Sequence, residues 1–188
     1  MAGSKDFLEK LASSHQSPDA LFIGCADSRV IPELLTSSAP GELFVIRNVA
    51  NLVPAAQRPD SCVGAALEYA VQALHIRHIV VCGHYGCGGV KAMIDGVDGT
   101  AMPELKAWLK DAAVQNSAAR AEPGDPEKQW QQAVEENVLD QLANLPSHPC
   151  VRDKLATGEL TLHGWIYDLR GQLLVYDHAT ASFGSAAE

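Results

Sequence analysis

Residues 77–89 read "RHIVVCGHYGCGG", a short apolar run followed by a turn rich in glycine. An apolar run of this length, bounded by a turn signal, is typical of a buried strand. The turn carries the imidazole of His84 and the thiol of Cys87, three positions apart. Its glycines allow the unusual dihedrals that a backbone needs to fold closely around an ion. The stretch therefore predicts a buried strand that ends in a turn bearing two potential metal ligands.

A second apolar run, residues 20–24, ends in the same way, because Cys25, Asp27 and Arg29 follow it directly. Further strands are predicted at 41–48 and 77–84. Helical spacing is found at 6–14, 61–75, 88–96, 103–119, 127–145 and 150–157. Strands that alternate with helices imply right-handed crossovers and a parallel sheet. We expect an α/β, three-layer fold with a central, mostly parallel sheet flanked by helices.

The chain is expected to form one domain over residues 1–188. Residues 1–15 are predicted to form a short N-terminal helical arm. Residues 159–177 read as strand, turn and strand, a C-terminal hairpin that adds an antiparallel or edge strand to the sheet.

Composition limits the classes of partner. The net charge of −9 argues against nucleic acid and against an anionic membrane surface, which both favour a basic protein. No apolar run is long enough to span a membrane, and the N-terminus has no secretion signal. Five cysteines are a poor disulfide framework. The cytoplasm is the expected location.

Cys25, His84 and Cys87 form the pattern C…H-x-x-C. Two thiolates and an imidazole are good zinc ligands, and both predicted strands end in the turns that carry them. If the two strands are neighbours, the turns share one edge of the sheet. The H-x-x-C spacing alone does not decide this, because a lone histidine after a strand is more often a core or surface residue. Cys82 is a rival ligand, although a small core thiol is the better interpretation.

Asp27 and Arg29 are expected to pair, since arginine holds a carboxylate in a fixed bidentate orientation. Such a pair is usually a loop salt bridge of little consequence. Here it lies two residues from a candidate metal ligand, which favours a functional role.

The segments "CADSRV", "PGELFVIRNVAN", "HIVVCGHYGCGG" and "HGWIYD" together resemble the β-class carbonic anhydrases, over nearly the whole chain. The resemblance implies reversible hydration of carbon dioxide to bicarbonate and a proton by zinc-bound hydroxide. It implies one Zn²⁺ per chain, held by Cys25, His84 and Cys87. Asp27 would accept a hydrogen bond from the water, or occupy the fourth position itself, and Arg29 would orient Asp27.

The resemblance also implies a substrate pocket formed by Gln16, Phe44, Val49, Tyr69 and Gly88, with some of these side chains contributed by a neighbouring subunit. A homodimer or a dimer of dimers is therefore expected. Simple core packing is the alternative for Val49.

Some members of the family have an accessory bicarbonate site made by a tryptophan, an arginine and a tyrosine. Arg47 and Tyr167 match two of these positions, but Phe22 stands where the tryptophan would be. The missing indole N–H predicts weakened or absent regulation by bicarbonate.

Two other functions stay open at this stage. The same fold and metal could hydrolyse carbonyl sulfide or carbon disulfide, or the chain could be a non-catalytic zinc-binding or redox module. A dinucleotide-binding fold is disfavoured, because the glycines of 83–89 do not match G-x-G-x-x-G.

Overall fold

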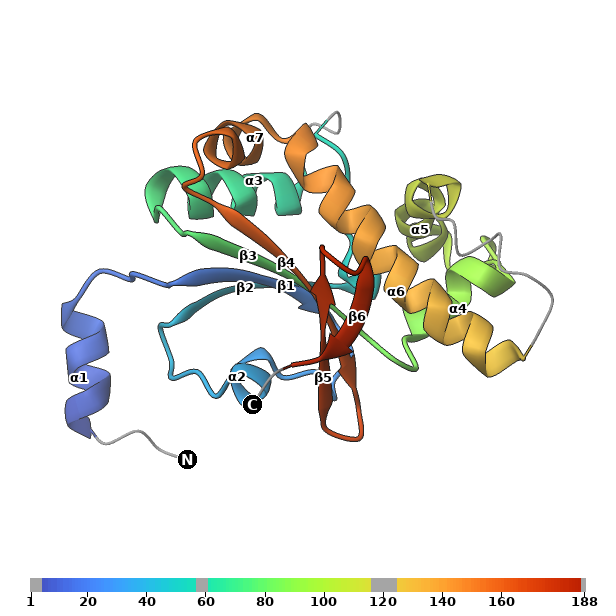
Figure 1. Cartoon of the computed structure of the whole chain (residues 1–188), viewed down its shortest axis with the longest axis horizontal. Coiled ribbons are helices and arrows are strands. Elements are labelled where there is room, and N and C mark those ends of the chain that lie inside the picture. Colours follow the sequence, from blue (N-terminus) through green and yellow to red (C-terminus); the bar gives the residue numbers. More distant parts are fainter. Residues whose placement is uncertain (1–4, 57–60, 116–124, 187–188) are drawn as a thin grey trace.

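One sheet of six strands organises the computed structural model of the chain, which describes residues 5–56, 61–115 and 125–186 (Figure 1). The strand order is β2-β1-β3-β4-β5-β6. The strands are β1 (Ala20–Cys25), β2 (Leu43–Asn48), β3 (His78–His84), β4 (Thr161–Asp168), β5 (Gln172–Asp177) and β6 (Ser182–Ser185).

The first four strands are parallel, and the last two add antiparallel pairs. This confirms the predicted mostly parallel sheet with an antiparallel edge. The strand β6 was not predicted. It is four residues long, contains two serines and a glycine, and has no alternation of apolar and polar side chains.

The predicted helices are present, with small shifts at their ends. They are α1 (Lys5–Ser13), α3 (Cys62–Glu68) with its π-helical continuation η2 (Tyr69–Ala73), α4 (Gly88–Asp95), α5 (Pro103–Gln115), α6 (Pro126–Asn144) and α7 (Pro149–Ala156). A short helix, α2 (Pro32–Thr36), and two 3-10 turns, η1 (Val49–Asn51) and η4 (Leu145–Ser147), were not predicted. The predicted helical residues 116–119, residues 1–4 of the arm and residues 121–124 of the predicted loop lie outside the described residues.

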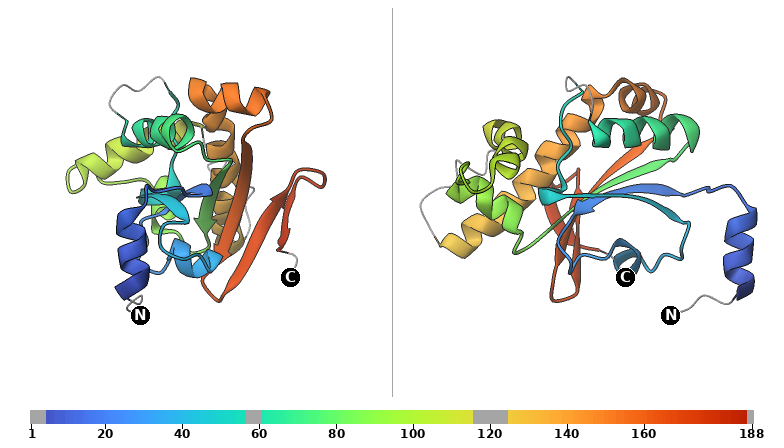
Figure 2. Two further views of the ribbon diagram at one scale, coloured as in Figure 1. Left: turned by 90° about the vertical axis from the view of Figure 1, so that its left-hand side faces the viewer. Right: turned by 180° about the vertical axis from the view of Figure 1, so that it is seen from behind.

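The sheet separates two apolar clusters, because side chains alternate between its faces. Leu21, Ile23 and Cys25 of β1 belong to the larger cluster, together with side chains of α3, α6 and α7. Phe22 belongs to the smaller cluster, with Val80, Cys82 and the partly buried Trp165. Helices α3, α6 and α7 lie on one side of the sheet and α2 on the other (Figures 1 and 2). The predicted three-layer architecture is therefore confirmed.

Helix α1 stands away from the sheet and contributes no buried residue (Figures 1 and 2). Within the described ranges, no helix has both the length and the apolar character required to cross a lipid bilayer.

Candidate metal centre

The two turns singled out in the sequence meet at one edge of the sheet. Strands β1 and β3 are parallel neighbours, with Ala20 opposite His78 and Gly24 opposite Cys82. Cys25 is the last residue of β1 and His84 the last of β3. Both turns therefore begin at the carboxyl ends of adjacent strands, where ligands gather in sheets of this kind.

Cys25, His84 and Cys87 form a buried cluster at this edge. One potential ligand atom from each residue lies within 4.8 Å of the others. The two sulfur atoms are 3.8 Å apart. All three residues are at most 5% exposed. The left-handed conformation of Gly86, with φ of 72°, lets the intervening turn bring Cys87 back towards His84.

The imidazole of His84 is oriented for metal binding. Its Nδ1 lies 3.0 Å from the carbonyl oxygen of Tyr85, which can only accept, so Nδ1 carries the proton. Its Nε2 is buried and has no hydrogen-bond partner among the described residues. An unpartnered buried nitrogen is costly in a protein interior, and a metal ion at this position would use its lone pair. The cluster therefore fits a zinc ion.

The sulfur atoms are surrounded by donors. A hydrogen bond from Cys87 lowers the pKa of Cys25 to about 4, with smaller contributions from His84 and from the backbone of Asp27 and Ala50, while burial opposes them. The same shared hydrogen bond, together with burial, raises the pKa of Cys87. An environment that favours a thiolate at Cys25 suits a metal ligand.

Cys82 is a core thiol rather than part of the cluster. It packs beside Phe22 and Val80 in the smaller apolar cluster, and its Sγ donates to the carbonyl of Gly83 at 3.4 Å. Burial raises the pKa of Cys82 to about 12, so it stays protonated.

Asp27 and Arg29 form a bidentate pair beside the cluster. Arg29 donates from Nε to Oδ1 at 2.9 Å and from Nη2 to Oδ2 at 2.7 Å, and its backbone N–H also donates to Oδ1. The pair holds the pKa of Asp27 well below its usual range. Asp27 Oδ2 lies 3.8 Å from Nε2 of His84. An ionised hydrogen-bond acceptor is thus fixed next to the candidate metal position.

The predicted pocket residues divide into two groups. Gly88 begins α4 directly after Cys87. Val49 packs against the same segment, since a Cβ added to Gly89 would lie 2.9 Å from Cγ1 of Val49. Phe44 and Tyr69 contact each other, with ring centroids 5.9 Å apart. Phe44 pairs with Leu21, four residues and about 13 Å along the strand from Cys25.

Gln16 also lies away from the cluster within one chain. It is exposed and precedes the amino end of β1, whereas Cys25 closes the carboxyl end. Tyr69 is 49% exposed, so the Phe44–Tyr69 pair is a surface feature of the isolated chain.

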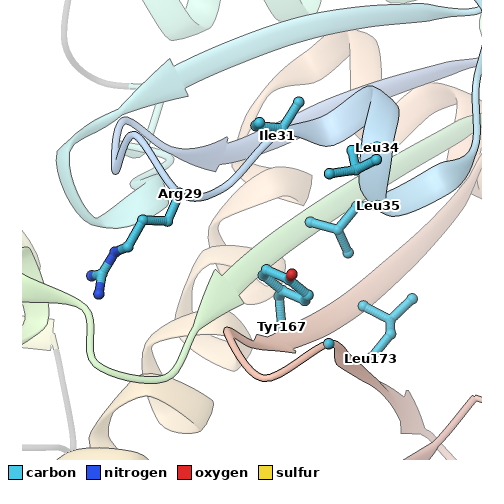
Figure 3. Close-up of a pocket in the computed structure, with 7 residues that line it drawn as sticks. Arg29, Ile31, Leu34, Leu35, Tyr167 and Leu173 are labelled. Atoms are coloured by element: carbon cyan, nitrogen blue, oxygen red, sulfur yellow. The ribbon is translucent and has the colours of Figure 1, made fainter.

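Arg47 and Tyr167, two residues of the predicted accessory site, have different surroundings within one chain. Arg47 donates to the carbonyl oxygens of Cys25 and Asp27, at 3.1 and 2.5 Å. Tyr167 instead lines a cavity of about 150 Å³ with Arg29, Leu34, Leu35 and others (Figure 3). Arg47 does not line this cavity, and the guanidinium of Arg29 points away from the two leucines (Figure 3).

Sequence reasoning missed the side chains of α6 that bind the loop after β2. Asn137, Gln141 and Asn144 hydrogen-bond the backbone of Ala50 and Val53. Their spacing of four and three residues places them on one helix face, which is a usable signal. Nothing in the sequence showed which loop that face would meet.

Comparison with known proteins points to one group. A family model described as carbonic anhydrase matches residues 20–173. A carbonic anhydrase of Pseudomonas aeruginosa is 45% identical and covers 96% of this chain and 83% of its own length. The solved β-carbonic anhydrase CcaA superposes with a TM-score of 0.90 at 38% identity, over 97% of this chain and 90% of that one. A structure from a study of two tetrameric β-carbonic anhydrases of Sordaria macrospora gives a TM-score of 0.80 at 29% identity, over 98% and 89%.

Proposed function

The chain belongs to the β-class carbonic anhydrases, and we propose that it hydrates carbon dioxide reversibly to bicarbonate and a proton, using one zinc ion per chain. The observation that carries this proposal is the buried Cys25–His84–Cys87 cluster with an ionised carboxylate fixed beside it.

Cys25, His84 and Cys87 would supply three protein ligands to the zinc and leave a fourth position open. When bound there, zinc supplies Lewis acidity that lowers the pKa of a coordinated water. The three ligands are buried, so the reaction would proceed at a site with little competing bulk water.

Asp27 is the proposed acceptor for the attacking water. Its carboxylate stays ionised because Arg29 holds its pKa low, so it can accept a hydrogen bond but cannot donate one. A hydrogen bond from the O–H to Asp27 would orient an oxygen lone pair towards the carbon of carbon dioxide. The proton that the reaction releases would go to solvent or buffer, because Arg29 keeps Asp27 ionised. Both carboxylate oxygens are bound by Arg29, which favours a resting site with Asp27 off the metal.

Metal analysis with stopped-flow carbon dioxide hydration tests this function. We expect about one zinc per chain and turnover from mildly acidic to mildly alkaline pH. A protein that binds zinc but turns over no substrate would favour a non-catalytic zinc-binding module. That alternative gives no role to the Asp27–Arg29 pair. Parallel assays with carbonyl sulfide and carbon disulfide test the alternative substrates, and faster consumption of either would contradict the proposal.

A second copy of the chain would complete the substrate pocket. Gln16, Phe44 and Tyr69 are remote from the cluster within one chain, and Tyr69 is exposed, so they would serve the site of a partner. A homodimer, or a dimer of dimers like the tetrameric relatives, would bring them there.

Mixing two inactive variants tests this arrangement. Tyr69→Ala keeps the metal ligands and Cys87→Ser keeps Tyr69, so a mixed dimer has one complete site. We expect each variant to have low activity alone and the remixed proteins to recover up to about one quarter of the original activity, if half the dimers are mixed. Absence of recovery, with mixed dimers demonstrated by native mass spectrometry, would contradict a shared pocket.

Regulation by bicarbonate is expected to be weak. Arg47 is engaged with two backbone carbonyls, and Phe22 has no polar hydrogen to donate. Initial rates measured against increasing bicarbonate near neutral pH should fall gradually, by simple product inhibition. Steep, cooperative inhibition would contradict this expectation.

We also propose a cytoplasmic location. All five cysteines are free, which suits a reducing compartment. Detection of the protein in a fractionated native cell tests this, and recovery with extracellular or periplasmic material would contradict it.

A further inference from the structure

The segment after β2 adopts an unfavourable backbone conformation next to the metal ligands. Ala50 and Asn51 have φ angles of 65° and 48°, in the left-handed region, and neither is glycine. This conformation costs free energy for a residue with a Cβ, so surrounding contacts must hold it. The side chain of Asn51 adds to the cost, because it is buried and its amide atoms have no hydrogen-bond partner among the described residues.

The unusual conformation places Ala50 against the start of α4, directly after the turn that carries Cys87. Its backbone nitrogen lies close to Gly89, where an added Cβ would be 3.1 Å from it. Its methyl group lies against Gly89, where an added Cβ would be 2.9 Å from the Cβ of Ala50. Ala50 thus packs against the residue two positions after Cys87, so its conformation affects where that ligand lies.

Two buried amides of α6 hold this backbone. Asn137 is 0% exposed, and its Nδ2 donates to the carbonyl of Ala50 at 3.0 Å. Its Oδ1 accepts from Nε2 of Gln141 at 3.1 Å, and Oε1 of Gln141 accepts from the N–H of Val53 at 2.8 Å. Each amide both donates and accepts, so the orientation of each is determined by the other.

We infer that Asn137 is a positioning residue for the metal centre: with Gln141, it holds Ala50 in its left-handed conformation, so that Ala50 stays packed against Gly89 and fixes the turn that carries Cys87. The inference rests on the proposed zinc site. The hydrogen bonds of Asn137 go to Ala50 and Gln141, and none joins it to a metal ligand among the described residues. Its effect is transmitted through one backbone unit, and partners of this outer kind typically change metal affinity by about 10- to 100-fold.

The variant Asn137→Leu tests the inference, because leucine fills a similar volume but cannot hydrogen-bond Ala50 or Gln141. We expect its zinc dissociation constant, measured by competition with a chromophoric chelator, to rise by about 10- to 100-fold. The intensity of the sulfur-to-cobalt absorption band in the Co²⁺-substituted protein should also fall, since that band reports the geometry at the two cysteine ligands. Both readouts are independent of catalytic rate.

Leu142→Ala is the matched stability control. Leu142 lies on the same helix but packs against β4, where a Cβ on Gly164 would be 2.8 Å from its Cδ1. The substitution leaves a cavity beside β4 and removes no hydrogen bond to the Ala50 loop. Its zinc dissociation constant should stay close to that of the unsubstituted protein.

A second substitution separates positioning from general destabilisation. Glycine adopts a φ of 65° without penalty, so adding Ala50→Gly to Asn137→Leu should recover much of the lost zinc affinity. A purely structural role of Asn137 predicts no such recovery.

The possible outcomes are distinct. A dissociation constant for Asn137→Leu equal to that of Leu142→Ala, or no recovery with Ala50→Gly, overturns the inference. If Asn137→Leu does not fold, Gln141→Met removes the second half of the same network, and the same comparison with Ala50→Gly decides. An unsubstituted protein that binds no zinc overturns the proposed function instead.

Discussion

Replacing Cys87 with serine is expected to abolish zinc binding and to slow carbon dioxide hydration by at least about a thousand-fold. A neutral hydroxyl is a much poorer zinc ligand than a thiolate. Cys87 is 0% exposed, so water cannot readily take its place. Lewis-acid stabilisation is worth several kcal/mol, and each 1.36 kcal/mol corresponds to about a tenfold change in rate. Metal content by mass spectrometry and stopped-flow rates measure the two effects.

Cys82→Ser is the matched control for this variant. Cys82 is equally buried, and the chemical change is the same, but its thiol belongs to the smaller apolar cluster on the other face of the sheet. The control should retain one zinc per chain and most of its activity. If zinc survives in Cys87→Ser and is lost in Cys82→Ser, the proposed ligand set is wrong.

Replacing Asp27 with asparagine is expected to reduce the rate by about 10²- to 10⁴-fold while one zinc per chain is retained. The amide keeps the size of the side chain but removes its charge, so it no longer forms the ion pair with Arg29. It can also turn its NH₂ group towards the attacking water, so that a donor faces the water O–H where the carboxylate would accept a hydrogen bond. The three-ligand cluster does not include Asp27, which is why the metal should remain.

Asp19→Asn is a suitable control, since Asp19 is exposed and precedes the amino end of β1. Its rate should match that of the unsubstituted protein.

Arg29 lowers the pKa of Asp27 in the folded protein. The ionised Asp27 therefore stabilises the fold at any pH above the usual carboxyl pKa, and this stabilisation is lost only as the pH falls through the lowered pKa. The pH dependence of the rate near neutrality therefore does not report Asp27. An Asp27→Asn variant with unchanged rate would remove Asp27 from the mechanism.

Much of the fold could be predicted because its core strands are continuous apolar runs. Residues 21–24 and 79–83 are buried on both faces of a parallel sheet, which explains their unbroken apolar sequences. The helices that follow have clear periodicity and end signals, such as Gly96 after α4. Short elements could not be predicted in this way. Helix α2 has five residues, and β6 has mixed polarity, so their structure depends on neighbouring elements.

The chemical groups of the candidate site could also be predicted from the sequence, since thiol, imidazole and carboxylate side chains follow two predicted strands. The left-handed conformation of Ala50 was not accessible. Alanine gives no local signal for it, because the conformation is imposed by Asn137, which is 87 positions away in the chain. The location of Gln16, Phe44 and Tyr69 at the far end of the sheet from the cluster likewise required the strand register.

The order of apolar runs and glycine-rich turns by itself determined that this protein has a mostly parallel α/β sheet. It also determined that two cysteines and a histidine stand at strand ends. Both could be predicted because the residue type decides whether a segment is buried and whether its backbone can turn sharply. Only the tertiary structure decided that β1 and β3 are neighbours, that Cys82 faces away from the cluster and that α6 clamps the loop of Ala50. Those arrangements depend on which surfaces pack together, and contacts between residues far apart in the chain leave no pattern within either local segment.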